Sequence, residues 1–106
     1  MVNRFDAYLI NLDEKLSADP KNTRPAVVIS PDELNRNLET VIIAPLASTD
    51  ARYPTRIEVD FLNAARFVIL DQIRTVDKSR LVKKIGNLER PVQRKLLDRL
   101  QELFAE

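Results

Sequence analysis

The sequence contains no cysteine and no histidine among its 106 residues, and these absences exclude several kinds of chemistry. Without cysteine the chain can form no disulfide, has no thiol nucleophile and offers no thiolate metal ligand. Without histidine it lacks the commonest general base and the commonest metal ligand. Any catalysis must therefore rely on carboxylates, hydroxyls, lysine or arginine.

Glycine and long apolar runs are also scarce. Gly86 is the single glycine of the chain, so we expect Asn63 to supply the left-handed backbone that a turn around it requires. No apolar run approaches the roughly 20 residues that cross a bilayer, and the N-terminus has no signal-peptide core. The length is sufficient for a hydrophobic core. We therefore expect a cytoplasmic protein with one domain, residues 1–106.

Charge is nearly balanced over the whole chain but not along it. The formal net charge is +1, with 8 Lys or Arg against 11 Asp or Glu in residues 1–73 and 9 against 5 in residues 74–106. A basic C-terminal end is compatible with binding a polyanion, but two solvated helices would give the same counts. Composition alone does not decide between these interpretations.

Short segments rich in β-branched and aromatic residues predict a mainly β protein. The predicted strands are residues 5–12, 26–30, 40–44, 56–60 and 66–71. Pro45 should end the third strand, and the last two strands should form a hairpin around Asn63. Residues 13–23 are expected to form a surface loop, and residues 47–50 a polar tip that carries hydroxyl groups.

Two short helices are predicted from start signals. One follows Ser30, which should act as the N-cap while Glu33 completes a capping box. The other is expected over residues 79–84, between a capping Asp77 and a terminating Gly86.

A longer helix is predicted over residues 90–105, where apolar residues recur at intervals of three and four. This stripe consists of Val92, Leu96, Leu97, Leu100, Leu103 and Phe104. We assign Phe104 and Phe67 to the core. The expected fold class is α+β and mainly β: an antiparallel sheet of about five short strands, barrel-like, with an amphipathic C-terminal helix packed against it.

Arg24 stands directly before Pro25 and a run of β-forming residues. A charged group on a rigid strand beside a loop is well placed to face a ligand. A surface arginine whose aliphatic stem lies along the sheet would give the same pattern. The local sequence leaves both interpretations open.

Two motifs in a fixed order make the chain similar to one family. The first is Arg24-Pro25 before the apolar run, and the second is Asp71-Gln72 followed by Arg74-Thr75. Further similarity lies in residues 6–13, 23–30, 41–46, 53–55, 70–77 and 81–88. The chain resembles the MazF/PemK-type toxin endoribonucleases of bacterial toxin–antitoxin systems.

This resemblance implies a small SH3-like barrel with added helices, usually a homodimer. It implies cleavage of single-stranded RNA at short sequences without a metal or another cofactor, by attack of a 2′-hydroxyl on the adjacent phosphate. It also implies a cognate antitoxin, whose acidic segment covers the RNA groove.

The resemblance assigns catalytic roles to individual residues. Arg24 matches the arginine that stabilises charge developing on the phosphate, a role suited to a planar cation that binds phosphate oxygens in pairs. Asp71 matches an acidic position that helps to activate the 2′-hydroxyl, although a strand-end aspartate can equally be structural. Asp19 is the other candidate base, and Ser48 or Thr49 is expected to position the phosphate.

RNA contacts are expected from side chains near these residues. Arginines would contact phosphates, and a tyrosine could stack on a base. The candidate RNA-binding residues are Arg52, Tyr53, Arg56, Arg66, Gln72 and Arg74.

Four positions depart from the family pattern. Ser17 stands where a glycine is usual, Asp19 where a glutamate is usual and Asn22 where a lysine is usual, and Ala47 takes the place of a catalytic hydroxyl. An alternative function is therefore an impaired or engineered dimer that binds antitoxin, RNA or another protein without cleaving RNA.

Overall fold

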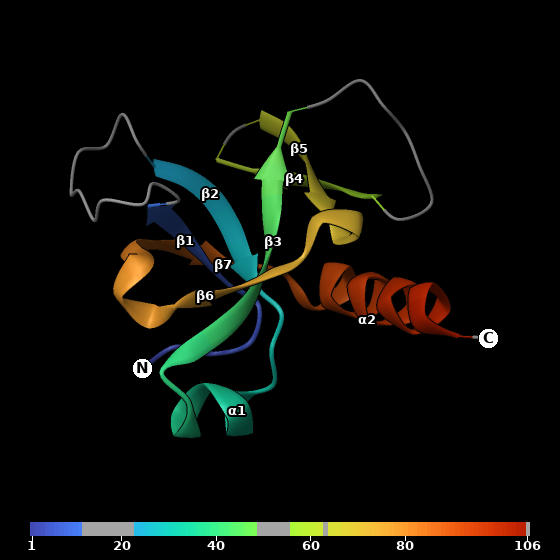
Figure 1. Cartoon of the computed structure of the whole chain (residues 1–106). Helices are drawn as coiled ribbons and strands as arrows, with labels where there is room; N and C mark the ends of the chain where they lie inside the picture. The colour runs from blue at the N-terminus through green and yellow to red at the C-terminus, as the bar shows by residue number, and fades with distance from the viewer. Residues whose placement is uncertain (12–22, 49–55, 63, 106) are drawn as a thin grey trace.

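The computed structural model describes residues 1–11, 23–48, 56–62 and 64–105, and in these residues the chain forms one curled antiparallel sheet (Figure 1). Its strands are β1 (Asp6–Asn11), β2 (Thr23–Val28), β3 (Thr40–Ala47), β4 (Arg56–Phe61), β5 (Ala64–Ile69), β6 (Arg74–Asp77) and β7 (Leu81–Asn87). The strand order is β4-β5-β3-β2-β1-β7, and β6 pairs with β3. This confirms the predicted mainly β fold of small-barrel type.

Four helical segments accompany the sheet. They are α1 (Asp32–Asn37), the 3-10 turns η2 (Leu70–Gln72) and η3 (Lys78–Arg80), and α2 (Arg90–Phe104). Figure 1 shows α1 at one end of the sheet and α2 beside it, near the chain's C-terminus. Among the described residues, no helix is both long and apolar enough to cross a membrane.

Each face of the central strands carries its own apolar cluster, because successive side chains on a strand point to opposite faces. Val27 and Ala44 belong to the larger cluster, whereas their neighbours Ala26 and Ile43 belong to the smaller one. The larger cluster includes Leu96 of α2, which therefore covers that face. The smaller cluster also contains Ile10, Val28, Val41 and Val76.

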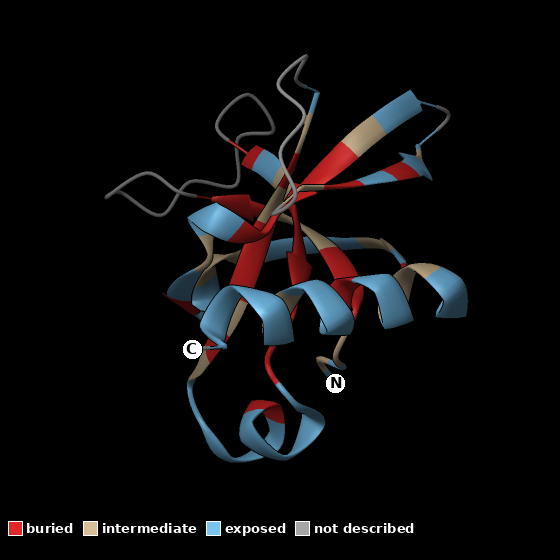
Figure 2. Cartoon of the chain, turned by 90° about the vertical axis from the view of Figure 1, so that its right-hand side faces the viewer, coloured by how far each residue is buried: buried red, intermediate tan, exposed pale blue. Residues whose placement is uncertain are grey.

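The C-terminal helix is confirmed, but its apolar stripe is narrower than predicted. Leu96 is fully buried, and Val92 and Leu100 pack partly against the larger cluster. Phe104 is 71% exposed, so its assignment to the core is wrong. The last turn of α2 lies beyond the edge of the sheet (Figure 1), and Figure 2 shows the outer surface of this helix exposed in front of buried strands. Phe67, by contrast, is buried as predicted.

The helix predicted over residues 79–84 is wrong, because this segment forms η3 and then β7. β7 pairs antiparallel with β1, with Ala7 opposite Gly86 and Tyr8 opposite Lys84. The register shifts between these two pairs, so a β-bulge lies next to the glycine. Pairing with β1 overrides the weak local helix signal, and Gly86 lies within a strand instead of ending a helix.

The capping box predicted at Ser30 is also wrong. α1 has Pro31 as its N-cap and makes no side-chain cap hydrogen bond. The buried Ser30 hydroxyl donates to Asn35 Oδ1 and accepts from the Ile42 backbone N–H at 3.1 Å. Asn35 Nδ2 in turn donates to the Ser30 carbonyl at 2.9 Å. Ser30 therefore joins β3 to α1 from inside the fold.

Pro45 does not end its strand, since β3 continues to Ala47. Pro45 pairs with Ala26 of β2 on one edge. On the other edge β3 pairs with β6 up to Ile43 and with β5 from Leu46 onward, so Pro45 occupies the position between two partners. Proline has no backbone N–H to donate. It is tolerated at this position because no continuous strand pairing requires that hydrogen bond.

The β4–β5 hairpin is confirmed, with Phe61 opposite Ala64. Leu62 adopts the left-handed backbone of its turn, with φ of 54°, whereas Asn63, to which that conformation was assigned, lies outside the described residues. β5 ends at Ile69 instead of residue 71, because the chain turns into η2.

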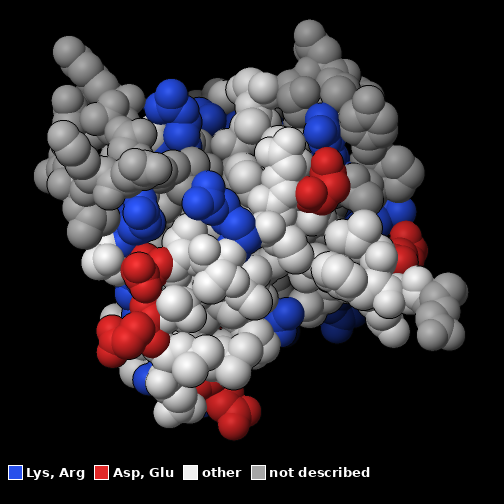
Figure 3. Space-filling view, in the orientation of Figure 1, with Lys and Arg blue, Asp and Glu red and all other residues white. Residues whose placement is uncertain are grey.

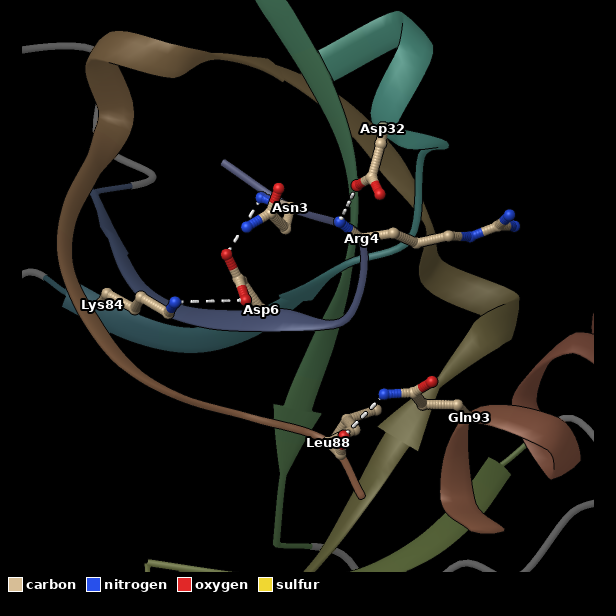
Figure 4. A network of polar contacts seen from close by, with 7 residues as sticks. All are labelled: Asn3, Arg4, Asp6, Asp32, Lys84, Leu88 and Gln93. Atoms are coloured by element: carbon tan, nitrogen blue, oxygen red, sulfur yellow. Dashed lines mark hydrogen bonds and ion pairs between the residues drawn. The ribbon is translucent and has the colours of Figure 1, made fainter. Parts of the chain in front are cut away.

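The N-terminal segment is tied to the sheet by a polar network (Figure 4). The backbone N–H of Asn3 donates to Asp6 Oδ2 at 2.9 Å, and Lys84 Nζ lies 3.4 Å from Asp6 Oδ1. The backbone N–H of Arg4 donates to Asp32 Oδ1 at 2.6 Å. Asn3 and Lys84 thus provide partners for the two oxygens of the buried Asp6 carboxylate, and this holds the start of β1.

Candidate functional site

A groove of about 270 Å³ lies over the smaller apolar cluster. Its described lining residues are Ile10, Arg24, Pro25, Ala26, Ile43, Pro45, Gln72 and Arg74. Two of these are arginines and none is a carboxylate, so the described part of the groove is basic at its rim and apolar at its floor.

Strand pairing explains why residues so distant in sequence meet here. Residues directly opposite one another in an antiparallel pair point to the same face of the sheet. Three such pairs line the groove: Ile10 opposite Arg24, Ala26 opposite Pro45, and Ile43 opposite Arg74. The register of four strands therefore places two arginines along one apolar floor.

Arg24 is the exposed second residue of β2, on the face that carries the groove. Its Nη1 donates to the Thr23 backbone carbonyl at 2.8 Å, which directs the guanidinium along the strand. Nearby, Arg80 Nη1 donates to the carbonyl of Asn11, opposite Thr23, at 3.2 Å and links η3 to the end of β1. A guanidinium is a planar cation with a delocalised charge, so Arg24 places positive charge at the groove.

Gln72 and Arg74 enter the groove from the opposite side. Gln72 ends η2 and Arg74 begins β6, and both side chains are exposed. In the view of Figure 3, Lys and Arg side chains gather at the upper left, whereas Asp and Glu side chains lie mostly below and to the right. The structure thus brings together three of the predicted site residues, Arg24, Gln72 and Arg74.

Arg56 and Asp71 do not line this groove but form an ion pair with each other. Arg56 Nε lies 3.5 Å from Asp71 Oδ1, and the two side chains are 13% and 37% exposed. Arg56 also faces a second cavity of about 370 Å³ between β4 and α2. Its other described lining residues are Ile57, Glu58, Lys95, Asp98, Arg99 and Glu102.

Arg66 and Ser48 are likewise not among the described lining residues of the groove. Arg66 Nε donates to the Phe61 carbonyl at 3.1 Å and so closes the hairpin. Ser48 is exposed and directly follows Ala47, the last residue of β3.

Several predicted positions lie outside the described residues. These are the candidate catalytic residues Asp19 and Thr49, the candidate RNA contacts Arg52 and Tyr53, and the departures Ser17 and Asn22. The described residues contain no group of three or more Asp or Glu side chains that could hold a metal ion.

The sequence alone does not reveal the apolar floor of the groove. It predicts Ile10, Ala26 and Ile43 only as strand residues, and Pro45 only as a strand end. Alternation along β2 offered one signal, because Arg24 and Ala26 are two residues apart and share a face. The partner strands could not be paired without knowing the register.

One protein family matches residues 3–104 of the chain, and its description is PemK-like, MazF-like toxin of type II toxin-antitoxin system. The chain belongs to this family. Among curated relatives, Endoribonuclease EndoA of Bacillus subtilis (strain 168) is 34% identical over 114 aligned residues, which cover 99% of this chain and 96% of that protein.

Solved structures of toxins share the fold. An endoribonuclease in complex with its cognate antitoxin, from a mycobacterial species, superposes with a TM-score of 0.81 at 20% identity, covering 96% of this chain and 93% of that one. A MazE–MazF structure from Deinococcus radiodurans superposes with a TM-score of 0.79 at 21% identity, covering 98% and 95%.

Proposed function

We propose that this family member is a toxin that cleaves single-stranded RNA. The observation that carries the proposal is the groove in which Arg24 and Arg74 flank an apolar floor. Fixed cations with apolar surface between them suit a polynucleotide, whose phosphates alternate with bases. The name of the Bacillus relative, an endoribonuclease, supports the same activity.

The reaction needs only groups that this chain possesses. The 2′-hydroxyl of one nucleotide attacks the adjacent phosphorus, the bond from phosphorus to the 5′-oxygen breaks, and this oxygen takes up a proton from water. The products are a cyclic phosphate and a 5′-hydroxyl. Arg24 would stabilise the negative charge that builds up on the phosphoryl oxygens, since it can donate to two of them at once. A carboxylate, Asp19 or Asp71, would take the proton of the attacking hydroxyl, and Ser48 or Thr49 would hold the phosphate.

Substrate contacts follow from the chemistry of the groove residues. Arg74 would bind a second phosphate, and the amide of Gln72 would both donate to and accept from a base edge. The other candidate contacts are Arg52, Tyr53, Arg56 and Arg66.

The proposed partners are an antitoxin, RNA and a second copy of the chain, in the cytoplasm. One of the solved neighbours is an endoribonuclease in complex with its cognate antitoxin, and another is a MazE–MazF structure. An acidic antitoxin segment would complement the basic rim of the groove and block access of RNA.

Cleavage of mixed single-stranded RNA in the presence of EDTA, with mapping of the RNA ends, tests this function. We expect cuts that leave cyclic phosphate ends, and a loss of about 10²–10³ in kcat for Arg24→Ala. Arg36→Ala is the matched control, because Arg36 is an exposed arginine on α1. Figure 1 shows α1 at the end of the sheet away from the start of β2, the strand whose second residue is Arg24. Cleavage that survives Arg24→Ala unchanged would contradict the proposed mechanism.

The alternative function, a binding module without nuclease activity, is favoured by one observation. Ala47, at the position where the family carries a hydroxyl, ends β3 and offers no polar side-chain atom. RNA binding without any cleavage at high protein concentration would identify this alternative.

A further inference from the structure

The turn η2 sends its three side chains in three directions. Leu70 is fully buried in the larger apolar cluster, Asp71 reaches Arg56, and Gln72 reaches the groove. In Figure 1 this turn is the short coil that connects β5 to β6. Gln72 thus directly follows two residues that are each in contact with another part of the fold.

Ile73, the residue after the turn, also packs against the larger apolar cluster, so the turn is held on its core side as well as through Asp71. It is a three-residue 3-10 segment without a side-chain cap hydrogen bond, and it takes no part in the strand pairing on either side. Such turns have poorer hydrogen-bond geometry than longer helices. Gln72 ends the turn and Arg74 follows two residues later. A change in the path of the turn would therefore move both of these groove residues.

Arg56 is well placed to fix Asp71. It is the first residue of β4 and lies opposite Ile69, the last residue of β5 before the turn. Its side chain is only 13% exposed, and partial burial reduces the screening that weakens an ion pair in open solvent. Its other side borders the cavity next to α2.

We propose that Arg56 and Asp71 are positioning residues that hold η2 so that Gln72 and Arg74 face the RNA groove. The inference rests on the proposed function and refines it, because it removes Asp71 from the role of base and Arg56 from direct contact with RNA. Asp19 then stays as the candidate base.

Charge reversal distinguishes positioning from proton transfer. In RNA cleavage, Arg56→Asp and Asp71→Arg should each raise KM roughly tenfold to a hundredfold, because the groove residues are displaced. The double variant should recover most of this loss, since the ion pair is restored with opposite polarity. Asp71→Asn keeps an oxygen acceptor for Arg56 but loses the charge of the ion pair, so it should raise KM by no more than about fivefold.

A general base would give the opposite pattern. Asp71→Asn would then lose about 10²–10⁴ in kcat, and the double variant would not recover, because an arginine does not accept a proton at neutral pH. Either result would overturn the proposal.

Backbone amide hydrogen exchange tests the same idea without any activity. Arg56→Gln should speed exchange at Gln72 and Arg74 and leave Val27 unchanged. Arg99→Gln is the matched control, since it removes the same charge from an exposed pair with Glu102. Unchanged exchange at Gln72 and Arg74 in Arg56→Gln would overturn the proposal. If the protein cleaves no RNA but exchange responds as expected, the proposed function fails and the positioning role stands.

Discussion

At Gly86 both the backbone conformation and the neighbouring Phe61 ring disfavour a side chain. The φ of Gly86 is +150°, in a region that residues with a Cβ rarely adopt. A Cβ built there would lie 3.0 Å from Cζ of Phe61. In a chain with one glycine, this position beside the bulge between β1 and β7 is where the glycine is needed.

Gly86→Ala should lower the free energy of unfolding by about 1–3 kcal/mol, because it forces strained backbone and pushes on the Phe61 ring. Urea unfolding followed by far-UV circular dichroism measures the change. Lys83→Ala, at an exposed site in the same strand, serves as the control. Equal midpoints for the two variants would show that the positive φ does not require glycine.

Among the elements, α2 has one side that packs on the core and another side that faces solvent. Leu96 and Leu97 are adjacent in sequence, yet Leu96 is fully buried and Leu97 is 37% exposed. At the start of the helix, Gln93 Nε2 donates to the Leu88 carbonyl at 2.8 Å (Figure 4), which ties α2 to the end of β7. The helix is therefore held at its first turn and at its middle.

Leu96→Ala should destabilise the protein by about 2–5 kcal/mol, since it leaves a cavity between α2 and the sheet. Leu97→Ala removes the same atoms from a half-exposed position and should cost clearly less. Chemical denaturation of both variants gives the comparison. Similar losses would mean that the two faces of α2 contribute equally, contrary to their burial.

For the molecule as a whole, the distribution of charge matters more than its sum. A formal net charge of +1 offers no general attraction to RNA, whereas Arg24 and Arg74 concentrate positive charge along one groove. Local charge of this kind attracts a polyanion to one surface. Only a few phosphate contacts should form, so the affinity for RNA should fall with salt concentration with a shallow slope.

Arg74→Ala should make the slope of log K against log salt concentration shallower by about 0.7, the value for one phosphate contact on a single strand. Fluorescence anisotropy with a labelled 2′-O-methyl RNA pool, titrated at several NaCl concentrations, measures the slope. Arg36→Ala should leave it unchanged. An unaltered slope in Arg74→Ala would exclude a phosphate contact at that residue.

Local sequence patterns predict the mainly β fold, the β4–β5 hairpin and the C-terminal helix, which the structure confirms, and they single out Arg24 as a candidate site residue. These features depend on periodicity, local propensity and short motifs. Such signals are contained in residues that are close together in the sequence. A family resemblance added the expected activity and most of the candidate site residues.

Strand pairing and side-chain contacts, in contrast, come from the tertiary structure. Residues 81–87 became a strand because β1 was available to pair with them, and the buried Ser30 hydroxyl accepted a bond from the Ile42 backbone because the fold brings β3 beside it. The register of β1, β2, β3 and β6 placed Arg24 and Arg74 on one groove. Such contacts join residues far apart in sequence, so no local pattern encodes them.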